Sequence, residues 1–257
     1  MLHSAIQVAT YKNPIYTVLS AVLLLSTASC VSTVPSPTQI GTIKNADYCQ
    51  ADAQTPSYKN QSTQQRAMSC MLAELQPYQQ TNMTAYQQYF AYKAQAWLSY
   101  AMHKDSMNSR SPAGLQAAEA AETILQALKN GTEQDLILIQ DIPATSALMR
   151  PDLWATLSAL KDSGGIVSAP REIAFSEVAL IWAATDQCEH GSPQSGSQFR
   201  MADRWLEQAR EAYVNNHDSK TNVALQDLIV RYYKQYAPLD AIADRCAGQI
   251  LPTVDKI

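Results

Sequence analysis

Residues 84–103 constrain the fold of this chain more than any other stretch, because their apolar and small residues follow the period of an α-helix. Five of them recur at steps of four, four, three and four residues, which places them on one helical face: Tyr86, Phe90, Ala94, Trp97 and Ala101. A small residue one turn before and one turn after a tryptophan lets a neighbouring helix approach, while the indole fills the remaining space. The pattern predicts a protein built by pairing helices.

The same arrangement returns 108 residues later, where Trp205 lies between Ala202 and Ala209 and is followed by leucine, as Trp97 is. One interpretation is a tandem-repeat binding scaffold of the tetratricopeptide kind. The other is that two helices of an ordinary helical domain use the same packing solution. Two copies without a regular period of ~34 residues favour the second interpretation. Trp97 and Trp205 are then expected to be buried, with Ala94, Ala101, Ala202 and Ala209 as packing residues.

The first 29 residues have the features of a targeting segment rather than of a folded element. Lys12 precedes an apolar run at residues 15–25, and small residues follow at 26–29. The run is shorter than the ~20 apolar residues that a membrane-spanning helix needs. It has the length of a signal-peptide core, and the small residues lie where a peptidase would cut.

The residues around Cys30 refine this prediction. Ser26-Thr27-Ala28-Ser29-Cys30 resembles the lipobox of bacterial lipoproteins, although Thr27 stands where leucine is most common. The resemblance implies that Cys30 is lipid-modified and is the first residue of the mature protein. Val31, in place of aspartate, implies sorting to the outer membrane. The alternative is an ordinary cleaved signal peptide with a cysteine nearby.

The mature chain would be mildly acidic. Loss of residues 1–29 takes Lys12 with it, which leaves 18 basic against 23 acidic residues and changes the formal net charge from −4 to −5. Such a balance argues against a nucleic-acid partner. Residues 30–61 are rich in Pro, Ser, Thr and Gln and lack apolar periodicity, so we expect a lipid anchor and a flexible tether there.

A helical domain is expected at residues 62–250, either as one body or as two lobes at about 62–130 and 168–250, and a tail at 251–257. The predicted class is all-α, with antiparallel helical hairpins packed as a bundle or as a short helical-repeat-like array. Ser111-Pro112 and Asn130-Gly131 mark the start and end of one helix, which forms a hairpin with residues 84–103. The other predicted helices are residues 62–75, 151–163, 168–188, one around Trp205, 221–236 and 239–246.

Some segments between these helices carry predictions of their own. Residues 168–188 are apolar on nearly all sides and should form a central helix. Residues 192–197 read as a Gly/Ser/Pro loop, and Pro238 should separate the last two helices. Residues 136–139, Leu-Ile-Leu-Ile, could form a short buried strand, although no partner strand is evident.

Two blocks of the chain resemble the helical region that precedes OmpA-type domains in some Gram-negative outer-membrane proteins. The first block comprises Lys93, Ala94, Trp97, Leu98, Tyr100, Ala101, Ser109 and the alanine-rich residues 117–125; the second comprises Glu177, Leu180, Trp182, Ala183, Cys188 and residues 200–203. The resemblance implies an envelope location and a helical scaffold. No OmpA-type module follows in this sequence, so the peptidoglycan binding of that module is not implied.

Motifs for catalysis or metal binding are sparse in this sequence. His103, His190 and His217 share no metal-ligand spacing, and the last two fall at predicted helix ends, where imidazole interacts favourably with the helix dipole. Neither a nucleophile elbow nor a zinc-protease motif nor a phosphate loop is present. Tyrosines clustered at residues 86–100 and 232–236 could line a glycan or peptide groove, or could lie at the core boundary with their hydroxyls in water.

These observations favour an envelope lipoprotein that acts as a binding or scaffolding module, with no cofactor. It would be anchored by lipid at the periplasmic face of the outer membrane and would bind an envelope protein partner. The alternative is a periplasmic hydrolase acting on an envelope polymer, with Glu177 or Glu189 as the acid. An enzyme should gather carboxylates with perturbed pKa values in a cleft, whereas a binding module should have an apolar or aromatic groove without them.

The cysteines predict a disulfide framework in an oxidising compartment. With Cys30 lipid-modified, Cys49, Cys70, Cys188 and Cys246 remain, and four cysteines allow three connectivities. We favour Cys49–Cys70 and Cys188–Cys246, because the latter two fall near predicted helix termini. Buried free thiols are the alternative.

Overall fold

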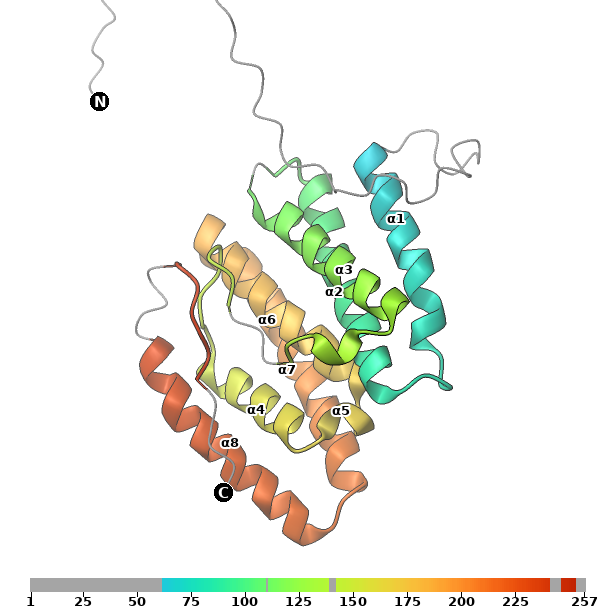
Figure 1. Cartoon of the computed structure of the whole chain (residues 1–257). Helices are drawn as coiled ribbons and strands as arrows, with labels where there is room; N and C mark the ends of the chain where they lie inside the picture. Colours follow the sequence, from blue (N-terminus) through green and yellow to red (C-terminus); the bar gives the residue numbers. More distant parts are fainter. Residues whose placement is uncertain (1–61, 110, 139–141, 241–245, 253–257) are drawn as a thin grey trace, which may run out of the picture. The chain divides into compact units, whose positions relative to one another are not determined.

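Eight α-helices form the described part of the chain, which comprises residues 62–109, 111–138, 142–240 and 246–252 of a computed structural model (Figure 1). They are α1 (Thr63–Leu75), α2 (Ala85–Ser106), α3 (Ala113–Asn130), α4 (Pro151–Asp162), α5 (Gly165–Ser168), α6 (Pro170–His190), α7 (Ser192–Asn215) and α8 (Ser219–Asp240). Short 3₁₀ turns at Gln76–Gln79 and Glu133–Asp135 follow α1 and α3. The predicted all-α class is confirmed for these residues, none of which forms a strand.

Local sequence signals set the helix ends. α1 and α2 each begin with a capping box, in which the hydroxyl of Ser62 or Thr84 accepts the N–H of the glutamine three residues later, at 3.1 Å. The Ser111 hydroxyl accepts the Ala113 N–H at the start of α3, and Gly131 ends that helix with φ +67°. Both ends of α3 thus lie where the sequence predicts them.

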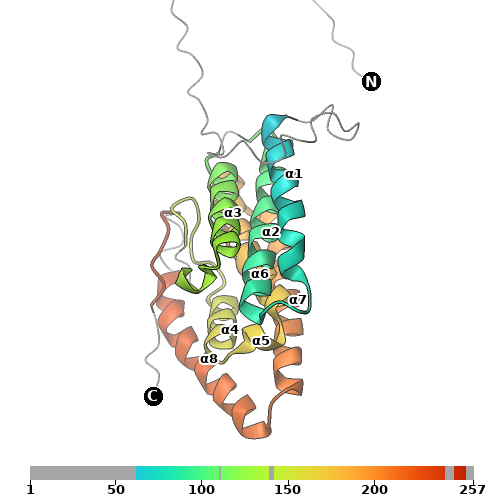
Figure 2. The same cartoon turned by 45° about the vertical axis from the view of Figure 1, so that its right-hand side comes forward.

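Three pairs of helices make up the bundle. α2 and α3 form the predicted antiparallel hairpin, α6 and α7 form a second, and α4 packs along α8 (Figures 1 and 2). α2 also packs on α6, which contacts α4 and α5 as well. The central position of α6 follows from its composition: Ile173, Val178, Leu180 and Ile181 are at most 1% exposed. In the described part of the chain, no helix is both long and apolar enough to cross a membrane.

One hydrophobic cluster runs from Ala67 to Leu251, through both segments considered above as separate lobes. Residues 246–252 lie beside the segment that precedes α4, and Leu251 belongs to this cluster (Figure 1). Gln249 pairs with Ile142 through backbone hydrogen bonds, and its side-chain oxygen accepts the Leu148 N–H at 2.6 Å. Its side-chain nitrogen donates to the Leu239 carbonyl at 3.1 Å.

Three local predictions were wrong. Residues 192–197 form the first turns of α7 rather than a loop, because Gly191 makes the turn and Ser195 is buried, donating a hydrogen bond to Gln187 of α6 at 2.6 Å. α8 continues through Pro238 to Asp240, since a proline in the last turn removes only one helical hydrogen bond. Residues 136–138 are not a strand: Ile137 is 76% exposed, and Leu138 gives its carbonyl to Lys161; Ile139 lies outside the described residues.

The two tryptophan motifs lie in different environments. The four alanines at 94, 101, 202 and 209 are at most 1% exposed, and Trp97 is 3% exposed. Trp205 is less completely buried than Trp97 but is not exposed to open solvent. Its ring packs against Phe175, with 5.5 Å between centroids, and beneath the guanidinium of Arg171 at 5.4 Å. Both contacts come from α6, so Trp205 lies in the interface between α6 and α7.

A disulfide joins Cys188, near the end of α6, to Cys246, as predicted, with the two Cα atoms 5.8 Å apart. Closing this loop should stabilise the fold by ~2–4 kcal/mol. Cys70 is also disulfide-bonded. The predicted partner Cys49 and the predicted lipidation site Cys30 both lie outside the described residues.

Candidate ligand-binding groove

A groove of about 830 Å³ is lined by residues of α2, α3 and α6 and by residues 135–137 and 142–145. We call this the α2–α3 groove. Its walls are mainly apolar and aromatic: Phe90, Trp97 and Tyr100 of α2, Ala113, Ala117, Ala120 and Ile124 of α3, Leu136, Ile137 and Ile142 of the connecting segment, and Ile181 of α6. Its volume falls in the range of ~300–1,000 Å³ that is typical of small-molecule sites.

A smaller hollow of about 310 Å³ adjoins this groove and shares Phe90 and Leu136 with it. Its other walls include Tyr86 and Leu138, which extend the apolar surface toward the first turn of α2. The tyrosines of α2 thus divide between two roles. Tyr86 and Tyr100 line the hollows, whereas Tyr89 is fully buried behind them.

Lys93 is the one lysine among the groove-lining residues, and it belongs to a buried ionic cluster that we call the Glu177 cluster. Glu177 of α6 accepts a hydrogen bond from Lys161 of α4 at 2.9 Å and from the Tyr89 hydroxyl at 2.5 Å. Lys93 Nζ lies 3.3 Å from the second carboxylate oxygen. All four residues are at most 6% exposed, so these charges interact inside the core.

The cluster holds an excess of positive charge. Burial alone would raise the pKa of Glu177, but Lys161, Lys93 and the Tyr89 hydroxyl outweigh burial and lower it to about 2. Burial lowers the pKa of Lys93 to about 8, with Glu177 opposing this shift and Lys161 adding to it. At pH 7 the carboxylate and Lys93 are therefore both ionised. Lys161 is the second lysine in contact with this carboxylate, so two lysine side chains face one glutamate.

This geometry argues against Glu177 as the acid of the hydrolase hypothesis. Glu177 is enclosed and ionised at neutral pH, so it has no proton to donate to a substrate. Glu189 is bound by the Lys104 ammonium at 2.7 Å and by the Ser111 hydroxyl. In the part of the chain that the structure describes, Asp135 is the one carboxylate lining the α2–α3 groove, and it is exposed.

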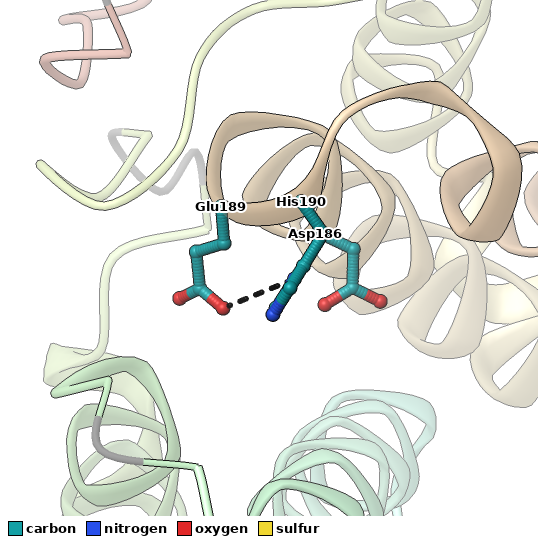
Figure 3. Close-up of side chains that lie close together, drawn as sticks. All are labelled: Asp186, Glu189 and His190. Atoms are coloured by element: carbon teal, nitrogen blue, oxygen red, sulfur yellow. Dashed lines mark ion pairs between the residues drawn. The ribbon is translucent and has the colours of Figure 1, made fainter. Parts of the chain in front are cut away.

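A second polar cluster lies at the end of α6, where Asp186, Glu189 and His190 come together (Figure 3). Their ligand atoms lie within 4.8 Å of one another, a proximity that the sequence spacing did not predict. Lys104 Nζ lies 2.7 Å from a carboxylate oxygen of both Asp186 and Glu189. Burial lowers the pKa of Lys104, but hydrogen bonds to these two carboxylates outweigh burial and raise it. A cation could bind here only if Lys104 moved away.

The three histidines of the described residues lie near the ends of helices. His217, just beyond α7, lies with Nδ1 2.7 Å from the Tyr213 carbonyl and stacks on the Tyr213 ring. His190 lies in the last turn of α6. His103, in the last turns of α2, packs against Trp182 with 5.1 Å between ring centroids.

Sequence reasoning named Glu177 and Lys93 but missed their connection, and it missed Lys161. The helical periodicity does contain a signal for these buried charges, namely a charged residue at an apolar position. Phe90, Lys93, Trp97 and Tyr100 are spaced by three, four and three residues, so a lysine interrupts an otherwise apolar face of α2. Glu177 interrupts the apolar helix α6 in the same way. Which charged groups meet in the core depends on how three helices pack, and one sequence does not contain that information.

The fold and the groove define this protein as an all-α bundle with an apolar groove and a buried lysine in the groove wall. Comparison of the chain with known protein families, with characterised proteins and with solved structures gives no significant match. The resemblance to the region preceding OmpA-type domains rests on the residues quoted above alone.

Proposed function

We propose that this protein is a binding module of the bacterial cell envelope, tethered to the outer membrane through a lipid on Cys30. The observation that supports a binding role is the α2–α3 groove, whose walls are apolar and aromatic. Among the described residues that line it, the one carboxylate belongs to Asp135, which is exposed. This is the arrangement expected of a ligand site, whereas a hydrolase needs carboxylates inside its cleft. An envelope protein partner would bind elsewhere on the helical surface.

The proposed location rests on the lipobox-like residues before Cys30 and agrees with the disulfide chemistry, since disulfides persist in the periplasm and are rare in the cytosol. Replacing Cys30 by serine should leave an unprocessed precursor or a protein without its anchor. Metabolic labelling with a radioactive fatty acid should mark the unmodified protein and not the variant. If the variant matures, labels and partitions with membranes like the unmodified protein, the lipoprotein assignment is wrong.

The groove itself can be tested with an uncharged apolar fluorophore such as N-phenyl-1-naphthylamine. We expect its fluorescence to rise on binding, and the Ala120→Trp variant to weaken binding by about tenfold or more, because the indole would fill space in the groove. Ala73→Trp, on the exposed surface of α1, is the matched control. Equal binding to both variants would show that the probe binds elsewhere and would remove the support for a groove ligand.

A further inference from the structure

The two lysines of the Glu177 cluster differ in how many hydrogen-bond acceptors their ammonium groups contact. Lys161 donates to Glu177 at 2.9 Å and to the backbone carbonyl of Leu138. In the described part of the chain, Lys93 Nζ has one acceptor within reach, Glu177 Oε2, at the longer distance of 3.3 Å. An ammonium group carries three N–H donors, so Lys93 keeps donor capacity while being 2% exposed.

Lys93 also belongs to the wall of the α2–α3 groove. Its side chain is one of the groove-lining residues, whereas Lys161 and Glu177 are not. On the same face of α2, the neighbouring groove residue Trp97 has an indole N–H that is buried without a hydrogen-bond partner among the described residues. One wall of an apolar groove therefore carries two donors that the protein itself leaves partly or wholly unused.

The charges indicate what kind of group would use these donors. Two lysine side chains contact one carboxylate, so the described residues of the cluster carry a formal charge of +1 inside the core. An uncompensated buried charge is unfavourable, and a group with one negative charge in the groove would neutralise it. Among the described residues of the groove wall, the other charged residue is Asp135, which is exposed to solvent.

We infer that the α2–α3 groove binds an amphiphile with a single carboxylate, whose carboxylate contacts Lys93 and whose apolar body packs on Trp97, Ala117 and Ile142. This inference rests on the proposed function, since it names the ligand class of the same groove. A monoanion matches the single excess charge of the cluster. The carboxylate would also complete the hydrogen bonding of Lys93 by charge-assisted bonds, which are roughly twice as strong as neutral ones.

Titration calorimetry with dodecanoate and dodecanol, both below their aggregation concentrations, tests the inference. We expect the purified domain to bind dodecanoate about tenfold or more tightly than dodecanol at pH 7. Lys93→Met should weaken dodecanoate binding by a similar factor and leave dodecanol binding nearly unchanged. Lys129→Met is the matched control, because Lys129 pairs with Glu74 on the exposed surface and should not alter either affinity. Lys93→Met should fold, since Lys161 and Glu177 remain as a balanced pair.

The possible results separate the two proposals. If both ligands bind equally and Ala120→Trp abolishes both, the groove is a ligand site but Lys93 does not recognise a carboxylate, so only this inference is overturned. If neither dodecanoate nor dodecanol binds but the neutral fluorophore does, the groove is again a ligand site, and again only this inference is overturned. If nothing binds in the groove, both proposals are wrong. If Lys93→Met fails to fold, the affinities of the unmodified protein for dodecanoate and dodecanol still show whether the groove prefers a carboxylate.

Discussion

Replacing Glu177 by glutamine should lower the free energy of unfolding by ~3–5 kcal/mol, as expected when one partner of a buried ionic cluster is removed. The carboxylate is 1% exposed and holds two ammonium groups and the Tyr89 hydroxyl. Glutamine keeps the shape of the side chain but not its charge, so Lys93 and Lys161 would face each other without a counterion. Urea unfolding at pH 7, followed by circular dichroism, measures the change.

Glu74→Gln provides the matched control, because Glu74 also pairs with a lysine, Lys129, at 2.8 Å, but with both side chains 35–43% exposed. Exposed pairs contribute ~0–1 kcal/mol, so the control should change little. The pKa of Glu177 is depressed to about 2, so its stabilisation is fully present above the pKa of an unfolded glutamate and is lost as pH falls toward 2. The difference between the Glu177 variant and the unmodified protein should therefore shrink below pH ~4. Similar losses for both variants at pH 7 would contradict this account.

Replacing Trp97 by alanine should lower the free energy of unfolding by ~3–5 kcal/mol, the range found for large core side chains. Trp97 is 3% exposed and packs near Tyr100, with 6.3 Å between ring centroids. The substitution would enlarge the α2–α3 groove at its inner wall, where the neighbouring alanines cannot move to fill the space. Urea unfolding again measures the effect.

Trp205→Ala is the informative comparison, because the two tryptophans have nearly the same local sequence. Trp205 is half-buried, so its removal should be clearly less destabilising than that of Trp97. The Trp205→Ala variant would lose the cation–π contact with Arg171. Such a contact contributes ~0.5–1 kcal/mol to stability at exposed sites. Equal destabilisation by the two substitutions would show that the local motif, rather than burial, determines the energy.

Much of the fold could be predicted because its signals are local. The starts of α1 and α2 follow from Ser62 and Thr84, the end of α3 from Gly131, and the central position of α6 from its apolar composition. The errors arose where packing overrides local preference. Gly191 makes a turn so tight that α7 starts at once, and residues 136–138 find their contacts in the groove wall and at Lys161.

The candidate site was less accessible to prediction. Lys93, Trp97 and Tyr100 could be placed on one face of α2, but the counter-ion Glu177 and the second lysine, Lys161, come from α6 and α4. Their sequence separations from Lys93 are large, and no local pattern links them. The pairing of Cys188 with Cys246 was predictable, because both lie near helix termini and the number of candidate cysteines is small.

The return of residues 246–252 to the segment before α4 has a consequence for the timing of synthesis. Gln249 bonds to Leu148, which is 101 positions earlier, so this part of the core stays open until the later residues have been translated. At ~5–20 residues per second, that interval is roughly 5–20 s. In addition, the Cys188–Cys246 disulfide forms only in an oxidising compartment. If the chain is exported unfolded, as the lipoprotein proposed above would be, this part of the core would be completed only after export.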